Sequence, residues 1–559
     1  MSQIVECVPN FSEGRDPVII KQITDEILKI EGVKLLDVDP GADTNRTVVT
    51  MVGEPSAVVE AAFQAIKKAS EVLDMRHHSG AHPRMGATDV CPFIPVSAIS
   101  MDECVELAKI LGKRVGEELN IPVYLYEFAA TREDRRNLAD IRAGEYEALP
   151  EKLKTPDFTP DFGPAAFNAK SGATVIGARK FLIAYNVNLN TRNRKIASDI
   201  ALDIREQGRA KRDDDGKFVR DAEGNQILLP GTLPAVKAVG WYIDEYNMAQ
   251  ISMNLVDYDV TPMHVAFDEV CAQANRRGLR VTGSELVGLV PLNALLQTGA
   301  YFLKKQSGST AVSEKELIRI AVQSMGLDEI APFDPNEKII EYQLKDKHQP
   351  SLVTMTVTDF ADELASDSPA PGGGSVAALA GSLGAALVNM VGVLTHDKKG
   401  YEAATIEVES LSLAARSLKE NLLKLVDEDT ESFNQVMSAM RLPKKTDEQK
   451  SVRDLAILQA TKVSASVPLR VMEACLKVVK LSARMAIIGN QNSLSDAGVG
   501  ILMARAGLEG AAMNVLINLQ GLGDPSFVTD MQEKVAALRS EMTKIAEENL
   551  AAIFSSLRK

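Results

Sequence analysis

The spacing of hydrophobic residues divides the chain into a part that alternates between strand and helix patterns and a part that is helical throughout. Up to about residue 344, short runs with a period of two residues repeatedly give way to stretches with a helical period. From about residue 352 onward, long helical periods dominate and strand patterns almost vanish. The pattern predicts two kinds of fold in one chain, an α+β (mixed α/β) part followed by an all-α helical bundle.

Residues 1–180 predict a first layer of strands and helices. The alternation places strands at residues 4–9, 33–39, 46–54, 90–96 and 122–126, and helices at 17–30, 56–73 and 102–119. This order is not an uninterrupted parallel series, so we expect a mixed sheet. Residues 157–172, DFTPDFGPAAFNAKSG, form a loop rich in Pro, Gly and Phe, and loops of this length in compact domains are often functional.

Residues 181–344 repeat this style and predict a second α+β unit. Strands are expected at residues 181–189, 236–242 and 250–257, and helices at 194–207 and 262–276. Residues 211–231 are polar and rich in turn residues, which predicts a surface insertion. Residues 345–352 are charged and contain a proline, as linkers between domains often do.

Residues 353–559 predict an all-α bundle. Helical periods occupy residues 356–365, 375–394, 403–440, 446–481, 499–519 and 530–557. Residues 375–395 carry no charge and are long enough to cross a bilayer. They are rich in Ala, Gly and Ser, contain Asn389 and lack flanking aromatic residues, so we interpret them as the buried central helix of the bundle and expect no membrane insertion.

Composition narrows the class of protein. At 559 residues the chain exceeds a single hydrophobic core, and its formal net charge of -14 argues against a nucleic-acid partner. The five cysteines, at positions 7, 91, 104, 271 and 475, have the spacing of neither a zinc site nor a disulfide framework. They suit a reducing compartment, and the N-terminus shows no basic or apolar leader pattern, so we expect a cytoplasmic location.

A histidine-rich loop offers the first candidate chemistry. Three of the six histidines lie within residues 77–82, and imidazoles move protons near neutral pH. His82 lies between two glycines, where the backbone can approach a ligand. Arg84 could hold a carboxylate bidentately while His82 moves a proton. The alternative is a surface loop with incidental histidines.

Two aspartates lie at the end of a predicted strand in the same unit. Asp37 and Asp39 flank one apolar residue at the strand end, so both point to one face and one of them could orient a histidine. The alternative is an aspartate that opens a turn. Arg46, in the polar loop that follows, could bind an anion, although the pattern there is not specific.

Two features of the bundle could serve chemistry. Residues 368–375, SPAPGGGS, place three glycines directly before a helix N-terminus, where free N–H groups favour an anion. The alternative is a tight turn, and no Lys follows the glycines as in a Walker loop. Asp429 lies in an acidic run near the apolar stripe of its helix, so it could be partly buried and act as an acid or base. The alternative for this run is a solvated face.

Several long motifs resemble those of one enzyme family. VECVPNFSEG, LLDVDPGADTNRTV, HPRMGATDVCPFIPV and IRAGEYEALP in the N-terminal half resemble the formiminotransferase domain of the formiminotransferase-cyclodeaminase family. SPAPGGGSVAA, LVDEDTESF, MRLPK and NVLINL in the C-terminal half resemble its cyclodeaminase domain. The motifs occur in order across both halves of the chain.

The resemblance implies a bifunctional folate enzyme of histidine degradation. The first domain would transfer a formimino group from N-formimino-L-glutamate to nitrogen-5 of tetrahydrofolate. The second would cyclise 5-formiminotetrahydrofolate to 5,10-methenyltetrahydrofolate and release ammonia. Neither step would need a metal or a tightly bound cofactor. Tetrahydrofolate, as a polyglutamate, would be a co-substrate. The family also implies a homo-oligomer built from dimers and as large as an octamer.

The resemblance also assigns residues to these steps. His82 matches the family's catalytic histidine, and Asp429 matches the carboxylate assigned to cyclodeaminase catalysis; Asp39 as the partner of His82 is our own inference. The predicted folate-binding loop comprises Gly163, Pro164, Ala165, Ala166, Phe167, Asn168, Ala169, Lys170, Ser171 and Gly172. The other predicted binding residues are Arg84 and the motif Gly372, Gly373, Gly374 and Ser375.

Two other functions remain open at this point. One is a monofunctional glutamate formiminotransferase whose helical domain serves oligomerisation only. The other is a folate-binding or scaffold protein without activity.

Overall fold

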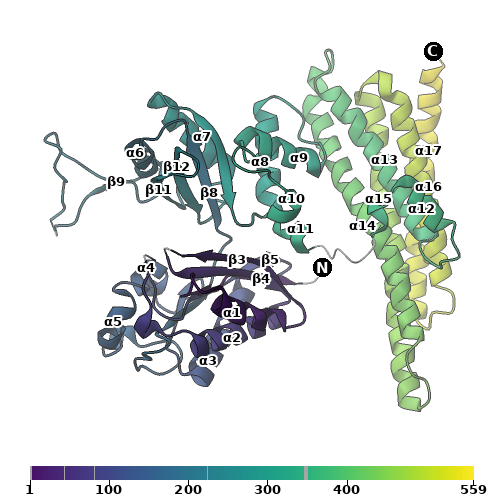
Figure 1. Ribbon diagram of the computed structural model, residues 1–559. Helices are drawn as coiled ribbons and strands as arrows, with labels where there is room; N and C mark the ends of the chain where they lie inside the picture. Colours follow the sequence, from purple (N-terminus) through teal and green to yellow (C-terminus); the bar gives the residue numbers. More distant parts are fainter. Residues whose placement is uncertain (1–2, 43, 81, 223, 345–350, 559) are drawn as a thin grey trace. The chain divides into compact units, whose positions relative to one another are not determined.

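The structure is a computed structural model that describes residues 3–42, 44–80, 82–222, 224–344 and 351–558 (Figure 1). It divides into two compact units. The first comprises Met1–Leu295 and Met325–Lys345, and the second comprises Leu296–Ser324 and Asp346–Lys559. The first unit contains both predicted α+β layers and the second is mostly helical, so the predicted fold classes are confirmed.

A seven-stranded sheet is the centre of the N-terminal half of the first unit. Its strands are β1 (Ile4–Cys7), β2 (Asn10–Phe11), β3 (Val33–Gly41), β4 (Arg46–Gly53), β5 (Thr88–Ser97), β6 (Val123–Glu127) and β7 (Thr174–Ala178). They follow the order β1-β4-β2-β5-β7-β6, and β3 pairs with β4. The pairs of β7 with β5 and β6 are parallel and the other pairs are antiparallel, as expected for a mixed sheet.

Three helices pack against this sheet and enclose its core. They are α1 (Pro17–Leu28), α2 (Pro55–Val72) and α3 (Met101–Leu119). The side chains buried between these layers include Phe11, Met51, Ile66, Phe93 and Leu111. Strand β7 was missed in the sequence because all five of its residues are buried, so it lacks the alternation that marks a half-exposed strand.

The second half of the first unit contains a four-stranded antiparallel sheet with the order β11-β12-β8-β13. Its strands are β8 (Ile183–Leu189), β11 (Val236–Ile243), β12 (Met248–Leu255) and β13 (Val281–Val287), and the helices α6 (Arg194–Ile204) and α7 (Met263–Arg276) pack against it. The polar insertion at residues 211–231 is exposed over most of its described length, and the strands β9 (Arg209–Ala210) and β10 (Leu228–Leu229) pair beside it.

Shorter helices lie between the larger elements of the chain. They are α4 (Leu138–Ile141), α5 (Glu145–Lys152), α8 (Leu292–Lys305), α9 (Glu314–Met325), α10 (Pro335–Lys338) and α11 (Ile340–Leu344). Single 3₁₀ turns lie at η1 (Met75–His77), η2 (Glu133–Arg135), η3 (Pro156–Phe158), η4 (Leu352–Thr354), η5 (Glu402–Ala404) and η6 (Gln491–Ser493).

The second unit is built from long helices (Figure 1). They are α12 (Val357–Leu364), α13 (Gly373–His396), α14 (Thr405–Met440), α15 (Asp447–Ile488), α16 (Leu494–Asn518) and α17 (Pro525–Leu557). Helix α13 packs against α14, α15 and α16, which confirms its predicted place at the centre of the bundle. Its N-terminus therefore faces side chains of neighbouring helices.

Small residues let α13 approach its neighbours closely. A Cβ added at Gly381 would lie 2.5 Å from the Sγ of Cys475, and one at Gly384 would lie 2.9 Å from the Gly500 carbonyl oxygen. By length and composition α13 and residues 491–518 could each cross a membrane, but 50% and 44% of their most apolar windows are buried inside the unit. The glycine content of α13 is thus explained by helix packing.

Residues 296–324 lie before the predicted linker in sequence, yet they group with the bundle. The Glu409 carboxylate on α14 accepts hydrogen bonds from the Ser309 Oγ (2.7 Å) and from the Thr310 N–H (2.8 Å) and Oγ1 (2.7 Å). The Arg416 guanidinium donates to the carbonyl oxygens of Thr310 (2.9 Å) and Val312 (3.1 Å). We call residues 309–312 the docking turn. The second compact unit therefore begins earlier in the chain than the predicted boundary at residue 344.

Most of the predicted linker, residues 345–350, lies outside the described residues. Its last two residues are part of the bundle: the Asp427 carboxylate accepts hydrogen bonds from the Ser351 Oγ (2.7 Å) and the Leu352 N–H (2.8 Å). The Leu352 side chain is buried. The chain is thus fixed to α14 from Ser351 onward.

Two candidate active sites

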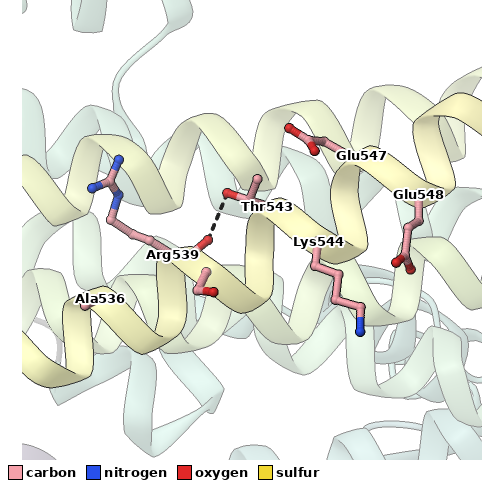
Figure 2. A pocket seen from close by; sticks show the side chains of 7 residues that line it. Ala536, Arg539, Thr543, Lys544, Glu547 and Glu548 are labelled. Carbon is pink, nitrogen blue, oxygen red and sulfur yellow. Dashed lines mark hydrogen bonds between the residues drawn. The ribbon is translucent and has the colours of Figure 1, made fainter.

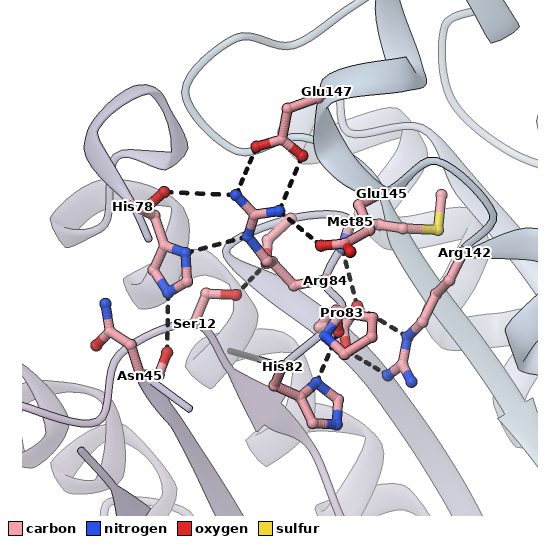
Figure 3. Close-up of polar contacts among 12 residues, drawn as sticks. Ser12, Asn45, His78, His82, Pro83, Arg84, Met85, Arg142, Glu145 and Glu147 are labelled. Carbon is pink, nitrogen blue, oxygen red and sulfur yellow. Dashed lines mark hydrogen bonds and ion pairs between the residues drawn. The ribbon is translucent and has the colours of Figure 1, made fainter. Parts of the chain in front are cut away.

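The first candidate site surrounds His82, which lies in the loop before β5 and is half-exposed (Figure 3). Its Nδ1 lies 2.7 Å from the Pro83 carbonyl oxygen. A carbonyl oxygen only accepts hydrogen bonds, so this contact places the proton of the neutral ring on Nδ1 and leaves the lone pair on Nε2. His82 is therefore set up to take a proton at Nε2.

The environment of His82 favours the neutral ring. Burial lowers the pKa of His82 below its usual value, and the positive charges of Arg46 and Arg142 lower it further. The Pro83 hydrogen bond and the negative charge of Asp89 oppose this shift. An imidazole that is neutral near pH 7 can act as a general base.

Arg84 has a different role from the predicted one. Its guanidinium binds the Glu147 carboxylate with two hydrogen bonds, of 2.6 and 2.9 Å, and the Glu145 carboxylate with one of 2.8 Å (Figure 3). These two carboxylates occupy the guanidinium N–H groups that were predicted to hold a substrate carboxylate. That prediction is wrong for the described structure. The sequence could not show this, because Glu145 and Glu147 lie about sixty residues further along the chain.

Arg84 instead braces the histidine loop. Its Nε donates to the Nδ1 of His78 at 3.2 Å, and the Nε2 of His78 donates to the Asn45 carbonyl oxygen at 2.8 Å. The Asn45 side chain in turn accepts from the Gly14 N–H and donates to the Ser79 carbonyl oxygen, each at 3.0 Å. His78 is thus a structural link in this chain of bonds.

Asp39 does not orient His82. It is exposed near the end of β3, and within the described residues it makes no hydrogen bond to the His82 ring, whose Nδ1 partner is the Pro83 carbonyl. The carboxylate whose charge acts on His82 is that of Asp89, which is buried and paired with the Arg142 guanidinium. The prediction for Asp39 is corrected in favour of a backbone partner.

The predicted folate-binding loop lies beside the histidine loop. The Ala87 N–H donates to the Ser171 carbonyl oxygen at 2.8 Å. Gly172 has a φ of +68°, and a Cβ added there would lie 2.2 Å from the Met85 carbonyl oxygen. A Cβ at Gly86 would lie 2.4 Å from the Ser171 carbonyl oxygen. Glycine at both positions lets the two segments touch along their backbones.

The two halves of the loop differ in exposure. Residues 163–167 are mostly exposed, and the Phe167 ring lies 5.5 Å from that of Tyr146. Residues 168–172 are anchored: the Tyr146 hydroxyl donates to the Ala169 carbonyl oxygen at 2.6 Å, and the Lys170 ammonium donates to the Glu71 carbonyl oxygen at 2.7 Å. The Asn168 amide is used within the loop to accept the Ser171 N–H at 3.0 Å. The exposed first half is thus the part open to a ligand.

Sequence reasoning missed the residues that hold this site together. They are Asp89, Arg142, Glu145, Tyr146 and Glu147, of which the last four lie in the IRAGEYEALP motif. The Tyr146 N–H donates to the Arg84 carbonyl oxygen at 2.9 Å, so α5 contacts the histidine loop and the predicted folate loop together. The IRAGEYEALP motif contains four of these residues, but in the sequence it indicated only the resemblance to an enzyme family.

The second candidate site is formed by Asp429 on α14 and the N-terminus of α13. The Ser375 Oγ donates to the Asp429 carboxylate at 3.1 Å and lies 3.3 Å from the Thr430 Oγ1. A Cβ added at Gly374 would lie 2.1 Å from the Asp429 Oδ1, so glycine is needed for this approach. The structure therefore brings together two features that the sequence predicted separately, the glycine motif and Asp429.

Burial raises the pKa of Asp429, and hydrogen bonds from the Ser375 side chain and backbone lower it in part. The carboxylate accepts these bonds at a helix N-terminus, where N–H groups favour its charged form. Gly372 is the N-cap residue of α13, and Gly373 is exposed. Asp429 is thus a half-buried carboxyl that can exist with or without its proton.

The neighbouring acidic residues have structural partners. Asp427 binds Ser351 and Leu352, and the Glu428 carboxylate pairs with Arg470 at 2.6 Å. A cavity of 400 Å³ opens on this side of α14, and its lining includes Pro371, Asp427, Thr430, Glu431 and Asn434. Of these residues, Thr430 also reaches Ser375, so the cavity adjoins the second site.

A further concavity of 660 Å³ lies along α17 (Figure 2). It is lined by Ala536, Arg539, Ser540, Thr543, Lys544, Glu547 and Glu548. All these residues belong to one helix, and the charged ones among them are of both signs, so the concavity has no convergent set of catalytic groups. Among the described residues there is also no group of three or more side chains that could hold a metal ion.

The structure places the two candidate proton-transfer groups in different folds, an imidazole in a mixed α/β unit and a carboxyl group in a helical bundle. Family models agree with this division. The formiminotransferase domain, N-terminal subdomain, matches residues 4–179, the formiminotransferase domain matches 184–345, and formiminotransferase-cyclodeaminase matches 356–537.

Known relatives cover the whole chain or one half of it. The formimidoyltransferase-cyclodeaminase of Rattus norvegicus is 44% identical over 558 residues, which is 100% of this chain and 99% of that protein. The glutamate formimidoyltransferase of Thermoplasma acidophilum is 47% identical over 54% of this chain and 92% of its own length. The methenyltetrahydrofolate cyclohydrolase of Methylorubrum extorquens is 40% identical over 34% of this chain and 92% of its own length. The chain belongs to the formimidoyltransferase-cyclodeaminase family.

Proposed function

We propose that His82 and Asp429 carry out the two consecutive reactions of this bifunctional transferase and cyclodeaminase. The observation that carries the proposal is the separation of two proton-transfer groups into two folds, each held by its own hydrogen bonds. His82 presents a free Nε2 because Nδ1 is bound to Pro83, and Asp429 lies at the glycine motif of α13. The proposed substrates are N-formimino-L-glutamate and tetrahydrofolate, the latter as a polyglutamate.

His82 would serve formimino transfer as base and then as acid. Nitrogen-5 of tetrahydrofolate attacks the formimino carbon, a bond forms between them, and His82 Nε2 takes the proton that nitrogen-5 loses. When the bond from this carbon to the glutamate nitrogen breaks, His82 returns the proton to that nitrogen. A group that takes and returns one proton suits a histidine that is neutral at rest.

Asp429 would serve the ring closure. Nitrogen-10 attacks the carbon of the formimino group, whose imino nitrogen is protonated, and Asp429 accepts the proton that nitrogen-10 loses. The same proton passes to the amino group on this carbon, which then leaves as ammonia and yields 5,10-methenyltetrahydrofolate. A carboxyl whose pKa is raised by burial gives up its proton less readily than an exposed one and so can relay it at a pH closer to neutral.

We further propose that the folate substrate contacts the exposed half of the loop at residues 163–172. This half is open to solvent, and the Phe167 ring, 37% exposed, offers a flat surface for a ring system. No tightly bound cofactor is part of the proposal.

The proposed assembly is a homo-oligomer built from dimers, as large as an octamer. An apolar stripe on α13 supports it: Val376, Leu383, Met390 and Leu394 are 38%, 48%, 38% and 51% exposed. A stripe of this kind on a central helix is suited to a contact with a second copy. Native mass spectrometry of the full chain would test the assembly, and a monomer at micromolar concentration would contradict it.

The assignment of the two sites is tested by His82→Ala and Asp429→Ala in the full chain. We expect His82→Ala to reduce formimino transfer by about 100- to 10,000-fold and to spare cyclisation of supplied 5-formiminotetrahydrofolate. Asp429→Ala should do the reverse. Loss of both activities in either folded variant would contradict separate sites.

The same assays distinguish the alternatives. A monofunctional transferase with a helical domain for oligomerisation would show transfer and no cyclisation in the wild-type chain. A scaffold protein would show neither reaction. The full-length relatives favour the bifunctional protein, because the 44% identity to the Rattus norvegicus protein extends over both halves of the chain.

A further inference from the structure

Arg46 is a partly buried cation without a carboxylate partner. It is the first residue of β4, and its Nη2 donates to the Asn10 side chain. Its Nε is buried and has no hydrogen-bond partner. Within the described part of the chain its guanidinium forms no ion pair. Burial lowers the pKa of Arg46 to about 10, which reflects the cost of holding this charge away from water.

The other two arginines of this site are neutralised by the protein itself. Arg84 binds the carboxylates of Glu145 and Glu147, and Arg142 binds that of Asp89. The positive charges of Arg84 and Arg142 are therefore balanced by carboxylates of the protein. Arg46 is the arginine of this group whose charge is available to a bound anion.

Arg46 also lies within electrostatic reach of His82. Its positive charge is one of the causes that lower the pKa of His82. The preceding residue, Asn45, is fixed to the histidine loop through its hydrogen bonds to Ser79 and His78. The start of β4 and the loop of His82 are thus held together, and Arg46 has a defined position beside the proton-transfer group.

We propose that Arg46 binds the α-carboxylate of the formimino donor, the role that the sequence suggested for Arg84. The inference rests on the proposed function of His82. In N-formimino-L-glutamate the α-carboxylate is attached to the carbon that carries the leaving nitrogen, so it must lie close to the group that protonates this nitrogen. A guanidinium binds a carboxylate through two parallel hydrogen bonds and fixes its orientation.

Binding of the donor at Arg46 would also change the pKa of His82, the proposed base. An anion on Arg46 screens the positive charge that His82 experiences, so the pKa of His82 rises when the donor binds. His82 would become a stronger base once its substrate is in place. The donor would therefore help to prepare its own reaction.

The test is Arg46→Met in the full chain, which removes the charge and keeps an unbranched side chain. The KM for formiminoglutamate should rise by about tenfold to a hundredfold, as expected for lost hydrogen bonds to a charged group. The KM for tetrahydrofolate and the cyclisation rate should change by less than about twofold, since a lost charge-assisted contact affects only the ligand that makes it. Arg136→Met, at an arginine whose side chain is 68% exposed, is the matched control and should leave all three unchanged.

Donor analogues separate the contact from a structural effect. Wild-type protein should use N-formimino-4-aminobutyrate, which lacks the α-carboxylate, about as poorly as Arg46→Met uses formiminoglutamate. With this analogue, the Arg46→Met variant should transfer the formimino group as well as the wild-type protein does. An analogue that lacks only the side-chain carboxylate should still show the full effect of Arg46→Met. The wild-type comparison remains valid if the variant fails to fold.

The pH profile gives a second readout. Removal of the Arg46 charge should raise the pKa of His82, so the acid limb of kcat/KM for transfer should move to higher pH. An unchanged donor KM together with an unchanged acid limb in a folded variant would overturn the inference. Failure of the wild-type protein to transfer the formimino group at all would instead overturn the proposed function.

Discussion

The two sites use burial to move two pKa values in opposite directions. At His82 burial and two arginine charges favour the neutral imidazole, so its pKa falls. At Asp429 burial favours the neutral carboxylic acid, so its pKa rises. Loss of water disfavours the charged form in both sites, and only the sign of the charge differs. One physical cause thus moves the two pKa values towards each other, so that the imidazole stays neutral to a lower pH and the carboxyl keeps its proton to a higher pH.

The sites differ in how their groups are positioned. His82 lies in a loop, and the position of this loop depends on bonds to distant segments, such as the bond from Arg84 to Glu147. Asp429 lies on a long helix and faces the N-terminus of another, so two regular elements define its position. The loop site therefore depends on hydrogen bonds between irregular segments, whereas the helix site depends mainly on the packing of two helices.

The largest expected effect is that of Gly172→Ala in the first unit. The positive φ and the clash with the Met85 carbonyl should separate the predicted folate loop from the histidine loop and cost roughly 2–5 kcal/mol. Unfolding of the first unit can be followed by fluorescence of Trp241, the one tryptophan of the chain. Transfer should fall with stability while cyclisation persists.

The control for that change is Gly216→Ala, a glycine with a positive φ of +80° in the surface insertion and no atom within 4 Å of an added Cβ. It should cost about 1 kcal/mol or less. Equal destabilisation by the two variants would show that the close approach at Gly172 does not matter.

A smaller effect is expected from Gly374→Ala in the second unit. The added methyl group would meet the Asp429 carboxylate, so the carboxyl should shift and cyclisation should fall by about 100-fold. Stability should change little because alanine favours a helix more than glycine does. Steady-state cyclisation of 5-formiminotetrahydrofolate is the measurement.

Gly523→Ala is the control variant in the same unit, because no atom lies within 4 Å of a Cβ added at Gly523. It should retain nearly full cyclisation. If both variants lost activity equally, the contact between Gly374 and Asp429 would not be the cause.

The smallest effect concerns the pH dependence of Ser375→Ala. The Ser375 hydrogen bond favours the charged form of Asp429, so its removal should raise the pKa of Asp429 further. A base is lost when pH falls through its pKa, and the acid limb of cyclisation should therefore move to higher pH. The transfer profile should not move. A fixed acid limb for cyclisation would argue against Asp429 as the base.

The sequence predicted long helices and the placement of His82 and Asp429 well, because helical periods and long motifs are local properties. It missed β7, which is buried on both faces, and it assigned Arg84 to a substrate because its partners Glu145 and Glu147 lie in another motif. The role of Asp39 was wrong since the true partner of His82 is a backbone carbonyl, which no side-chain pattern reveals. What could not be predicted is pairing between distant segments.

The docking turn has a consequence for the order of events during synthesis. Ser309 and Thr310 leave the ribosome well before Glu409 and Arg416, the residues that bind them. The first partner of this turn, Asn389 on α13, is made about eighty residues later, and the partners on α14 follow about a hundred residues after the turn. A chain cut at residues 345–350 would release two fragments, of which the first keeps a turn that fits the second. Mixing the fragments should therefore restore a complex in trans.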